Sequence, residues 1–191
     1  MVRRMRLSAL LVLAAACGNP DNLVLGGISA TATIPVASID NVRSAISGIV
    51  TLNDANGNRI GQKVAIILTN TSGLCTQLGS SPDYFQNPPQ DYVALILLTP
   101  LDQVGFFYFG RDPVAALVIP AAKGVKPATR YPAVNFPNTY IADSDLSGTG
   151  GNARGSFDIA VVDSFSQVHE FYGRFKTGSC DALANVIIAM P

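Results

Sequence analysis

The chain has 191 residues, of which 48% are hydrophobic and 14% are charged, so it can bury the core of one ordinary domain and is not a disordered protein. Its formal net charge is zero, and without three arginines near the N-terminus it would hold ten basic and thirteen acidic residues. Proteins that bind nucleic acid by neutralising phosphates need a basic face, so we exclude nucleic acid as a partner.

Turn-forming residues outnumber helix-forming ones in this chain. There are 17 glycines and 12 prolines, and the thirteen acidic residues include a single glutamate, Glu170. Glutamate and lysine favour helices, whereas aspartate, glycine and proline favour turns. We therefore predict an all-β fold, in which residues 41–191 form a single antiparallel β-sandwich of the immunoglobulin-like type with about eight strands. A closed β-barrel is the alternative.

The first sixteen residues have the pattern of an export signal. Arg3, Arg4 and Arg6 precede an uncharged, mostly apolar run over residues 7–16. A helix needs about 20 residues to cross the hydrocarbon core of a bilayer, so this run is too short for a transmembrane span. It matches the apolar region of a removable signal peptide, so we predict a signal peptide over residues 1–16 and export to the cell envelope.

The residues around the first cysteine carry a family resemblance. Ala15-Ala16-Cys17 resembles the end of the lipobox of bacterial lipoproteins. The resemblance implies cleavage before Cys17, attachment of acyl chains such as palmitate at that residue, and anchoring in a membrane. Gly18 follows in place of aspartate, which implies the outer membrane. The usual lipobox leucine is replaced by Ala14, and residues 14–16 also suit ordinary signal peptidase, so a soluble periplasmic or secreted protein is the alternative.

The chain has three cysteines: Cys17, Cys75 and Cys180. An odd count in an exported protein needs an explanation, and lipidation of Cys17 leaves an even pair. We predict a disulfide between Cys75 and Cys180, because the compartment outside the cytoplasm is oxidising. It would close a loop of about 105 residues and stabilise the fold by roughly 4 to 5 kcal/mol in the chain-entropy model.

A lipidated cysteine and a tether or entry segment occupy residues 17–40, and strands are expected after it. Alternation over residues 44–52 places Ile46, Val50 and Leu52 on one face and Ser47 on the other. Asn56-Gly57 predicts a hairpin turn. The other elements expected before residue 120 are strands over 63–70, 92–99, 105–110 and 115–119 and one helical turn over 73–78.

The C-terminal third contains the clearest hairpin. A proline-rich excursion over residues 124–138 precedes two alternating segments, 156–162 and 168–176, which we predict to be paired strands. A short strand over 186–189 would complete the domain. The segment from Gly155 to Cys180 resembles the closing strands of small lipoprotein β-domains of uncharacterised function, and this resemblance implies a fold but no site residue.

His169 is the only histidine, so a Ser-His-Asp hydrolase would have to use it. It lies within a predicted strand, and no G-x-S-x-G motif occurs in the chain. Glu170 has no second glutamate to form the carboxylate pair of a glycosidase. We therefore predict no catalytic residue, no cofactor and a structural role for His169, with a secreted hydrolase as an alternative.

Asp143, Asp145 and Ser147 have the spacing of the first oxygen ligands of a calcium loop. The twelfth position of such a loop is Arg154 here, where the pattern supplies a bidentate glutamate. A solvated turn is therefore the favoured interpretation, and we predict no metal site.

Two loops hold aromatic residues together with polar ones, which suits contacts with an envelope protein or a glycan. The candidate binding surface consists of Tyr84, Phe85, Arg130, Tyr131 and Phe136. These rings could instead fold back over the sheet. The sequence thus predicts a lipid-anchored, non-enzymatic binding or structural module of the cell envelope. Besides the hydrolase, the alternative is a carrier of an apolar ligand in a barrel or sandwich interior.

Overall fold

The computed structural model describes residues 21–28, 37–39, 41–101, 103–126, 128–143, 151–163 and 165–191. The predicted signal peptide, Cys17 and part of the predicted tether lie outside these described residues, as do Asp145 and Ser147. No helix in the described part of the chain is long and apolar enough to cross a membrane.

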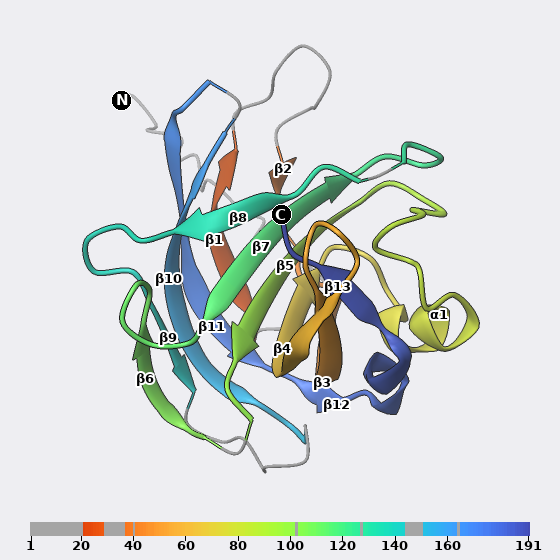
Figure 1. Ribbon diagram of the computed structural model, residues 1–191, viewed down its shortest axis with the longest axis horizontal. Coiled ribbons are helices and arrows are strands. Elements are labelled where there is room, and N and C mark those ends of the chain that lie inside the picture. Colours follow the sequence, from red (N-terminus) through yellow and green to blue (C-terminus); the bar gives the residue numbers. More distant parts are fainter. Residues whose placement is uncertain are drawn as a thin grey trace, which may run out of the picture.

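Within the described residues the chain forms thirteen strands, one α-helix and one short 3-10 helix (Figure 1). The strands are β1 (Leu23–Ile28), β2 (Ala37–Ser38), β3 (Ser44–Asn53), β4 (Arg59–Thr69), β5 (Tyr92–Thr99), β6 (Gly105–Tyr108), β7 (Ala115–Ala121), β8 (Tyr131–Val134), β9 (Tyr140–Asp143), β10 (Arg154–Val162), β11 (Val168–Lys176), β12 (Gly178–Ser179) and β13 (Ile187–Ala189). The helices are α1 (Leu74–Ser80) and η1 (Asp181–Asn185). The all-β prediction is confirmed.

The strands form one continuous sheet. Its order is β12-β3-β4-β5-β7-β8-β10-β11-β1-β2, with β13 beside β3, β9 beside β10 and β6 beside β9. Among the strands of the described residues, only β12 and β13 run parallel to their neighbour, β3. In the described residues no pairing joins the two ends of this path, so the alternative of a closed barrel is wrong. Half of the neighbouring pairs in the sheet, among them β3 with β4 and β10 with β11, are also consecutive in the chain, as hairpin connections produce.

Two hydrophobic cores lie on opposite sides of β4 and β5. Ile67 and Ile96 belong to the first core, which α1 and the C-terminal segment cover. Ile66 and Leu95, their neighbours in the chain, belong to the second core, which contains side chains of β9, β10 and β11. Successive side chains of a strand point to opposite faces, so a strand buried on both faces must be a continuous apolar run. The strand expected over residues 92–99 is confirmed as β5, and it is buried on both faces.

A disulfide joins Cys75 in α1 to Cys180, which follows β12, as the sequence predicts. Beside it, Leu78 of α1 and Leu183 of η1 are fully buried in the first core. Figure 1 shows α1 at one side of the molecule and β6 on the other. The disulfide therefore fastens the covering helix to the C-terminal segment at the side away from β6.

Five strands occur where the sequence predicts none. β8 and β9 lie within and just after the proline-rich excursion, β1 and β2 lie within the expected entry segment, and β12 follows the predicted hairpin. The Asn22 side chain donates a hydrogen bond to the Lys176 carbonyl and accepts one from its backbone N–H, at 3.1 and 2.8 Å. Residues before 41 are thus part of the domain. These strands are short, and they are stabilised by pairing with partners distant in sequence, which local alternation does not report.

Ser47 was expected on the exposed face of β3, and the structure corrects this. Its side chain is fully buried, because Gly151 and Thr177 cover it. The Ser47 hydroxyl donates to the Gly151 carbonyl at 2.6 Å and lies 2.6 Å from the Thr177 hydroxyl. The polar residue is tolerated in the interior because these hydrogen bonds satisfy it.

We expect the double variant Cys75→Ser, Cys180→Ser to lose about 2 to 5 kcal/mol of unfolding free energy, because the crosslink restricts the unfolded chain. Urea denaturation followed by circular dichroism measures the difference. Reductant should shift the midpoint of the wild-type protein toward that of the double variant and leave the variant unchanged. Equal midpoints for the oxidised wild type and the variant would contradict a stabilising role.

Candidate functional site

The predicted loop surface is wrong for Tyr84 and Phe85, which are both buried. The loop after α1 folds back beside β5, where the Tyr84 and Tyr92 rings stack with their centroids 5.0 Å apart. The Tyr92 hydroxyl donates a hydrogen bond to the Tyr84 carbonyl at 3.3 Å. Burial is the main cause that raises the pKa of Tyr92 well above its usual value. These rings are core residues of the first core.

The residues predicted in the second loop, Arg130, Tyr131 and Phe136, also differ in burial. Tyr131 is buried in the second core, so its part of the prediction is wrong as well. Arg130 is half-buried, and burial lowers the pKa of its guanidinium while the nearby Tyr92 raises it. Phe136 remains at the surface. The five residues therefore form no common surface, because Tyr84 and Phe85 are buried in the first core and Tyr131 is buried in the second.

His169 is bonded to an aspartate of the turn between β10 and β11. Its Nε2 lies 2.9 Å from Asp163 Oδ2, and both side chains are nearly buried. Asp163 Oδ1 accepts hydrogen bonds from the backbone N–H groups of Phe165 and Gln167 at 2.8 and 2.9 Å. The hydrogen bond from His169, followed by the one from Gln167, lowers the pKa of the Asp163 carboxyl. The pair can hold the turn in place, which is a structural task.

His169 has no other side-chain hydrogen bond within the part of the chain that the structure describes. A serine or cysteine nucleophile bonded to its second ring nitrogen is therefore not among those residues. Asp143, the first residue of the possible calcium loop, is buried at the end of β9, and the other two candidate ligands lie outside the described residues. No group of three or more His, Cys, Asp or Glu side chains that could hold a metal occurs among the described residues.

The most distinctive surface is the outer face of the strands β1, β11, β10, β9 and β6. Pairing aligns their outward residues in two rows. The first row is Leu25, Tyr172, Asp158, Tyr140 and Tyr108, and the second is Leu23, Arg174, Ser156, Ala142 and Phe106. Directly paired residues of antiparallel strands point to the same side. The intervening Phe157, Ile141 and Phe107 are buried on the opposite, inner side. We call these two rows the outer face.

Large apolar side chains are exposed on the outer face. Phe106 is 54% exposed and Tyr172 is 49% exposed, and Leu23, Leu25 and Tyr108 are exposed to a similar degree. The Phe106 ring contacts Tyr140 and Tyr108, at centroid distances of 4.7 and 5.6 Å. The Arg111 guanidinium lies 4.5 Å from the centroid of the Tyr108 ring, as in a cation–π contact. These contacts make three rings and one cation a continuous cluster.

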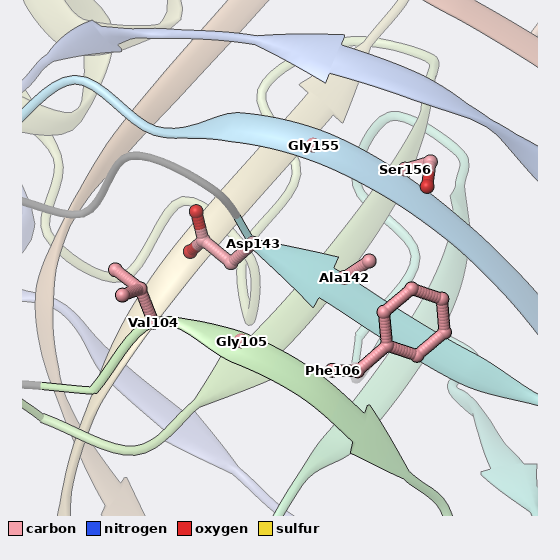
Figure 2. Close-up of a pocket in the computed structure, with 7 residues that line it drawn as sticks. All are labelled: Val104, Gly105, Phe106, Ala142, Asp143, Gly155 and Ser156. Atoms are coloured by element: carbon pink, nitrogen blue, oxygen red, sulfur yellow. The ribbon is translucent and has the colours of Figure 1, made fainter.

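A hollow of about 480 Å³ opens beside this cluster (Figure 2). Phe106, Ala142 and Ser156 lie along one side of it, and Val104 and Asp143 lie at its other end. Its lining also includes Gly105 and Gly155, which leave backbone without side chains. A Cβ atom on Gly155 would lie 1.9 Å from the Ala142 carbonyl oxygen, so this close strand contact requires glycine.

Charged side chains border the outer face where the chain enters β1. Arg154 and Lys176 are directly paired, Arg174 lies one row further in, and all three line a second hollow together with Asp21. The Lys176 ammonium lies 3.2 Å from an Asp21 carboxylate oxygen. Asp158 is the one carboxylate within the two rows, and partial burial, followed by the charge of Glu170, raises its pKa. The outer face thus has apolar and aromatic side chains toward its two edge strands, the polar Ser156 and Asp158 on its middle strand, and the cations Arg154 and Lys176 at one end.

The sequence alone indicates only part of the outer face. Alternation in residues 168–176 places Tyr172 and Arg174 on the side opposite to the buried Phe171 and Phe175, as the structure confirms. It gives no indication that Tyr140 and Phe106 join them, because that requires the pairing of β9 with β10 and β6.

We expect Asp163→Ala to loosen the turn between β10 and β11, because it removes the acceptor of three hydrogen bonds. Hydrogen exchange of residues 163–169 should become faster than in the wild type. The lowered pKa of Asp163 contributes stability above the unfolded-state pKa, and this stability is lost as the pH falls through the folded-state pKa. The wild-type turn should therefore loosen in acid, and the variant should lose that pH dependence.

Ser166→Gly is the matched control for this turn. Ser166 has a φ of 62°, so glycine relieves backbone strain without touching the Asp163 carboxylate. Exchange in this control should remain as slow as in the wild type at neutral pH. Exchange as fast as in Asp163→Ala would show that the turn does not depend on the carboxylate.

Asp158→Asn should raise the free energy of unfolding at pH 7 by about 0.5 kcal/mol, a small value because the group is only partly buried and solvent screens its charge. The sign follows from the raised pKa: the ionised carboxylate is disfavoured in the folded state, and this penalty is absent at acid pH, where the group is protonated in both states. Urea unfolding at pH 7 and pH 3 measures the difference. Glu170→Gln, which removes only the smaller cause, should give a smaller gain. A loss of stability in Asp158→Asn at pH 7 would refute this account.

No protein-family model matches this chain, and neither a curated protein nor a solved structure shows significant similarity to it.

Proposed function

We propose that this protein is a lipid-anchored component of the cell envelope whose β domain is a non-enzymatic binding module. The N-terminal signal pattern and the lipobox-like residues before Cys17 support the anchor. The disulfide between the two remaining cysteines supports an oxidising compartment outside the cytoplasm. The outer membrane is the proposed location, and a soluble exported protein is the alternative.

The observation that carries the binding role is the outer face. Single exposed apolar residues are ordinary on protein surfaces, but a contiguous group of them marks a site of interaction. Leu25 and Tyr172 are directly paired, and Leu23 lies in the next row of the same two strands. Phe106 exposes a further ring at the far strand, β6. The proposed binding surface is therefore a rigid sheet face in place of the two loops that the sequence indicated.

We also infer that the two halves of the sheet act as the layers of a sandwich. Side chains of β4, β5 and β7 share the second core with side chains of β10 and β11, as facing layers do. The meandering strand order is unlike the Greek-key order of immunoglobulin domains. The sandwich that we infer therefore has its own connectivity.

A non-enzymatic role also agrees with the surroundings of His169. Its Nε2 is bonded to Asp163, whose other oxygen holds two backbone N–H groups of the same turn. The histidine and aspartate therefore have a structural use that accounts for their contact. This supports the proposal that binding, and not hydrolysis, is the task of the domain.

Intact-mass spectrometry of protein purified from its native membranes tests the anchor. We expect a chain that begins at Cys17, carries the mass of acyl groups, and lacks two hydrogens because of the disulfide. Cys17→Ser should abolish the acyl mass and leave the disulfide in place. A mature chain that begins elsewhere, or an unmodified Cys17 in the soluble fraction, would contradict the proposal.

A further inference from the structure

We propose that the outer face lies against the surface of the membrane that holds Cys17, with a bilayer containing anionic lipids as its binding partner. This inference rests on the proposed lipid anchor and names the partner of the same surface. It is carried by three features: the short distance in sequence from Cys17 to the outer face, the amphipathic character of its side chains, and the cations at its border.

The length of chain between the lipidated cysteine and the outer face keeps that face near the bilayer. Leu23, the first outward residue of β1, follows Cys17 by six positions, and six residues span at most about 20 Å. Five strands at a spacing of about 4.8 Å extend over roughly 19 Å. The whole outer face is therefore within reach of the surface in which the acyl chains insert. A short link of this kind also gives a high effective concentration, so a weak contact suffices.

The side chains suit the boundary between headgroups and acyl chains. Leucine and phenylalanine are apolar, and tyrosine places an apolar ring next to a polar hydroxyl, which is why it is enriched at membrane interfaces. The outer face combines Leu23, Leu25 and Phe106 with the three tyrosines Tyr108, Tyr140 and Tyr172.

The ring contacts favour a bilayer over a polysaccharide. A sugar ring that stacks on an aromatic side chain needs a free ring face. Phe106 lies against Tyr140 and Tyr108 at interplanar angles of 31° and 36°, and Arg111 covers the Tyr108 ring. These contacts cover part of the ring surface on which a sugar would stack.

The cations lie where anionic headgroups would meet the outer face. Arg154 and Lys176 border it at the end where the chain enters, Arg174 lies within its second row, and Arg111 lies beside Tyr108 on the far side. Arginine and lysine are attracted to the negative surface of a bilayer over about one Debye length. Carboxylates oppose this attraction: Asp112 lies 3.0 Å from the Arg111 guanidinium, Asp21 lies 3.2 Å from the Lys176 ammonium, and Asp158 lies within the two rows.

A single tryptophan provides the test, because the chain contains none. The lipidated protein with Phe106→Trp is reconstituted into vesicles of phosphatidylcholine with about one third phosphatidylglycerol, part of the phosphatidylcholine being brominated in its acyl chains. Because a docked residue enters the region between headgroups and acyl chains, about 5 to 10 Å deep, we expect roughly twofold quenching and a blue-shifted emission. Replacing the anionic lipid by a neutral one should weaken the quenching.

Phe165→Trp is the matched control, because Phe165 is the most exposed large hydrophobic residue and lies in the turn between β10 and β11, away from the two rows. Its emission should resemble that of a solvated indole and should not be quenched. Thermal unfolding of both variants verifies that they are folded.

Several outcomes would overturn the inference. Unquenched Phe106→Trp in protein that is anchored in the vesicles refutes the membrane contact and leaves the anchor intact, whereas protein that fails to enter vesicles refutes the anchor. A blue shift that depends on protein concentration without quenching would assign the outer face to a second copy of the chain. A shift produced by soluble peptidoglycan fragments, in place of brominated lipid, would assign it to a glycan.

Discussion

The two-sided burial of β4 and β5 is the constraint on which the rest of this structure depends. Alternate side chains of these strands enter two different cores, so neither face can be left to solvent. One face is covered by α1, the loop that follows it and the C-terminal segment. The other is covered by the inner sides of β9, β10 and β11. Burying that inner side directs the alternate residues of the same strands outward, and the outer face is the result.

Close backbone contacts then fix which residues meet on the outer face. A Cβ atom on Gly173 would lie 1.9 Å from the Leu23 carbonyl oxygen, and the same separation applies to Gly155 and the Ala142 carbonyl. These glycines allow β1 and β9 to approach the central hairpin closely. Because a shift of one residue would turn every side chain of a strand to the other side, the register that the glycines permit also decides that tyrosine and leucine face outward.

The sequence predicts those strands whose pattern of apolar and polar residues is visible over a few consecutive positions. The hairpin of β10 and β11 and the doubly buried β5 each follow from a few consecutive residues. Ser47 and the pair Tyr84 and Phe85 were misplaced because their burial depends on segments distant in sequence or on a loop that folds back. The candidate site is non-local in the same way: Tyr172 could be oriented from its own strand, but its alignment with Tyr140 and Tyr108 arises only when five strands pair.

The two cores place α1 with its disulfide and the outer face on opposite sides of the molecule. The disulfide and α1 lie beyond the first core, whereas the outer face lies beyond the second, with the paired halves of the sheet between them. The two terminal strands are divided in the same manner, since β1 belongs to the half that carries the outer face and β13 pairs with β3 in the other half. A lipid attached six residues before β1 would therefore act on the half that exposes leucine and aromatic side chains. The same anchor placed after β13 would act on the opposite half, so the position of Cys17 and the position of the exposed rings support one orientation of the domain.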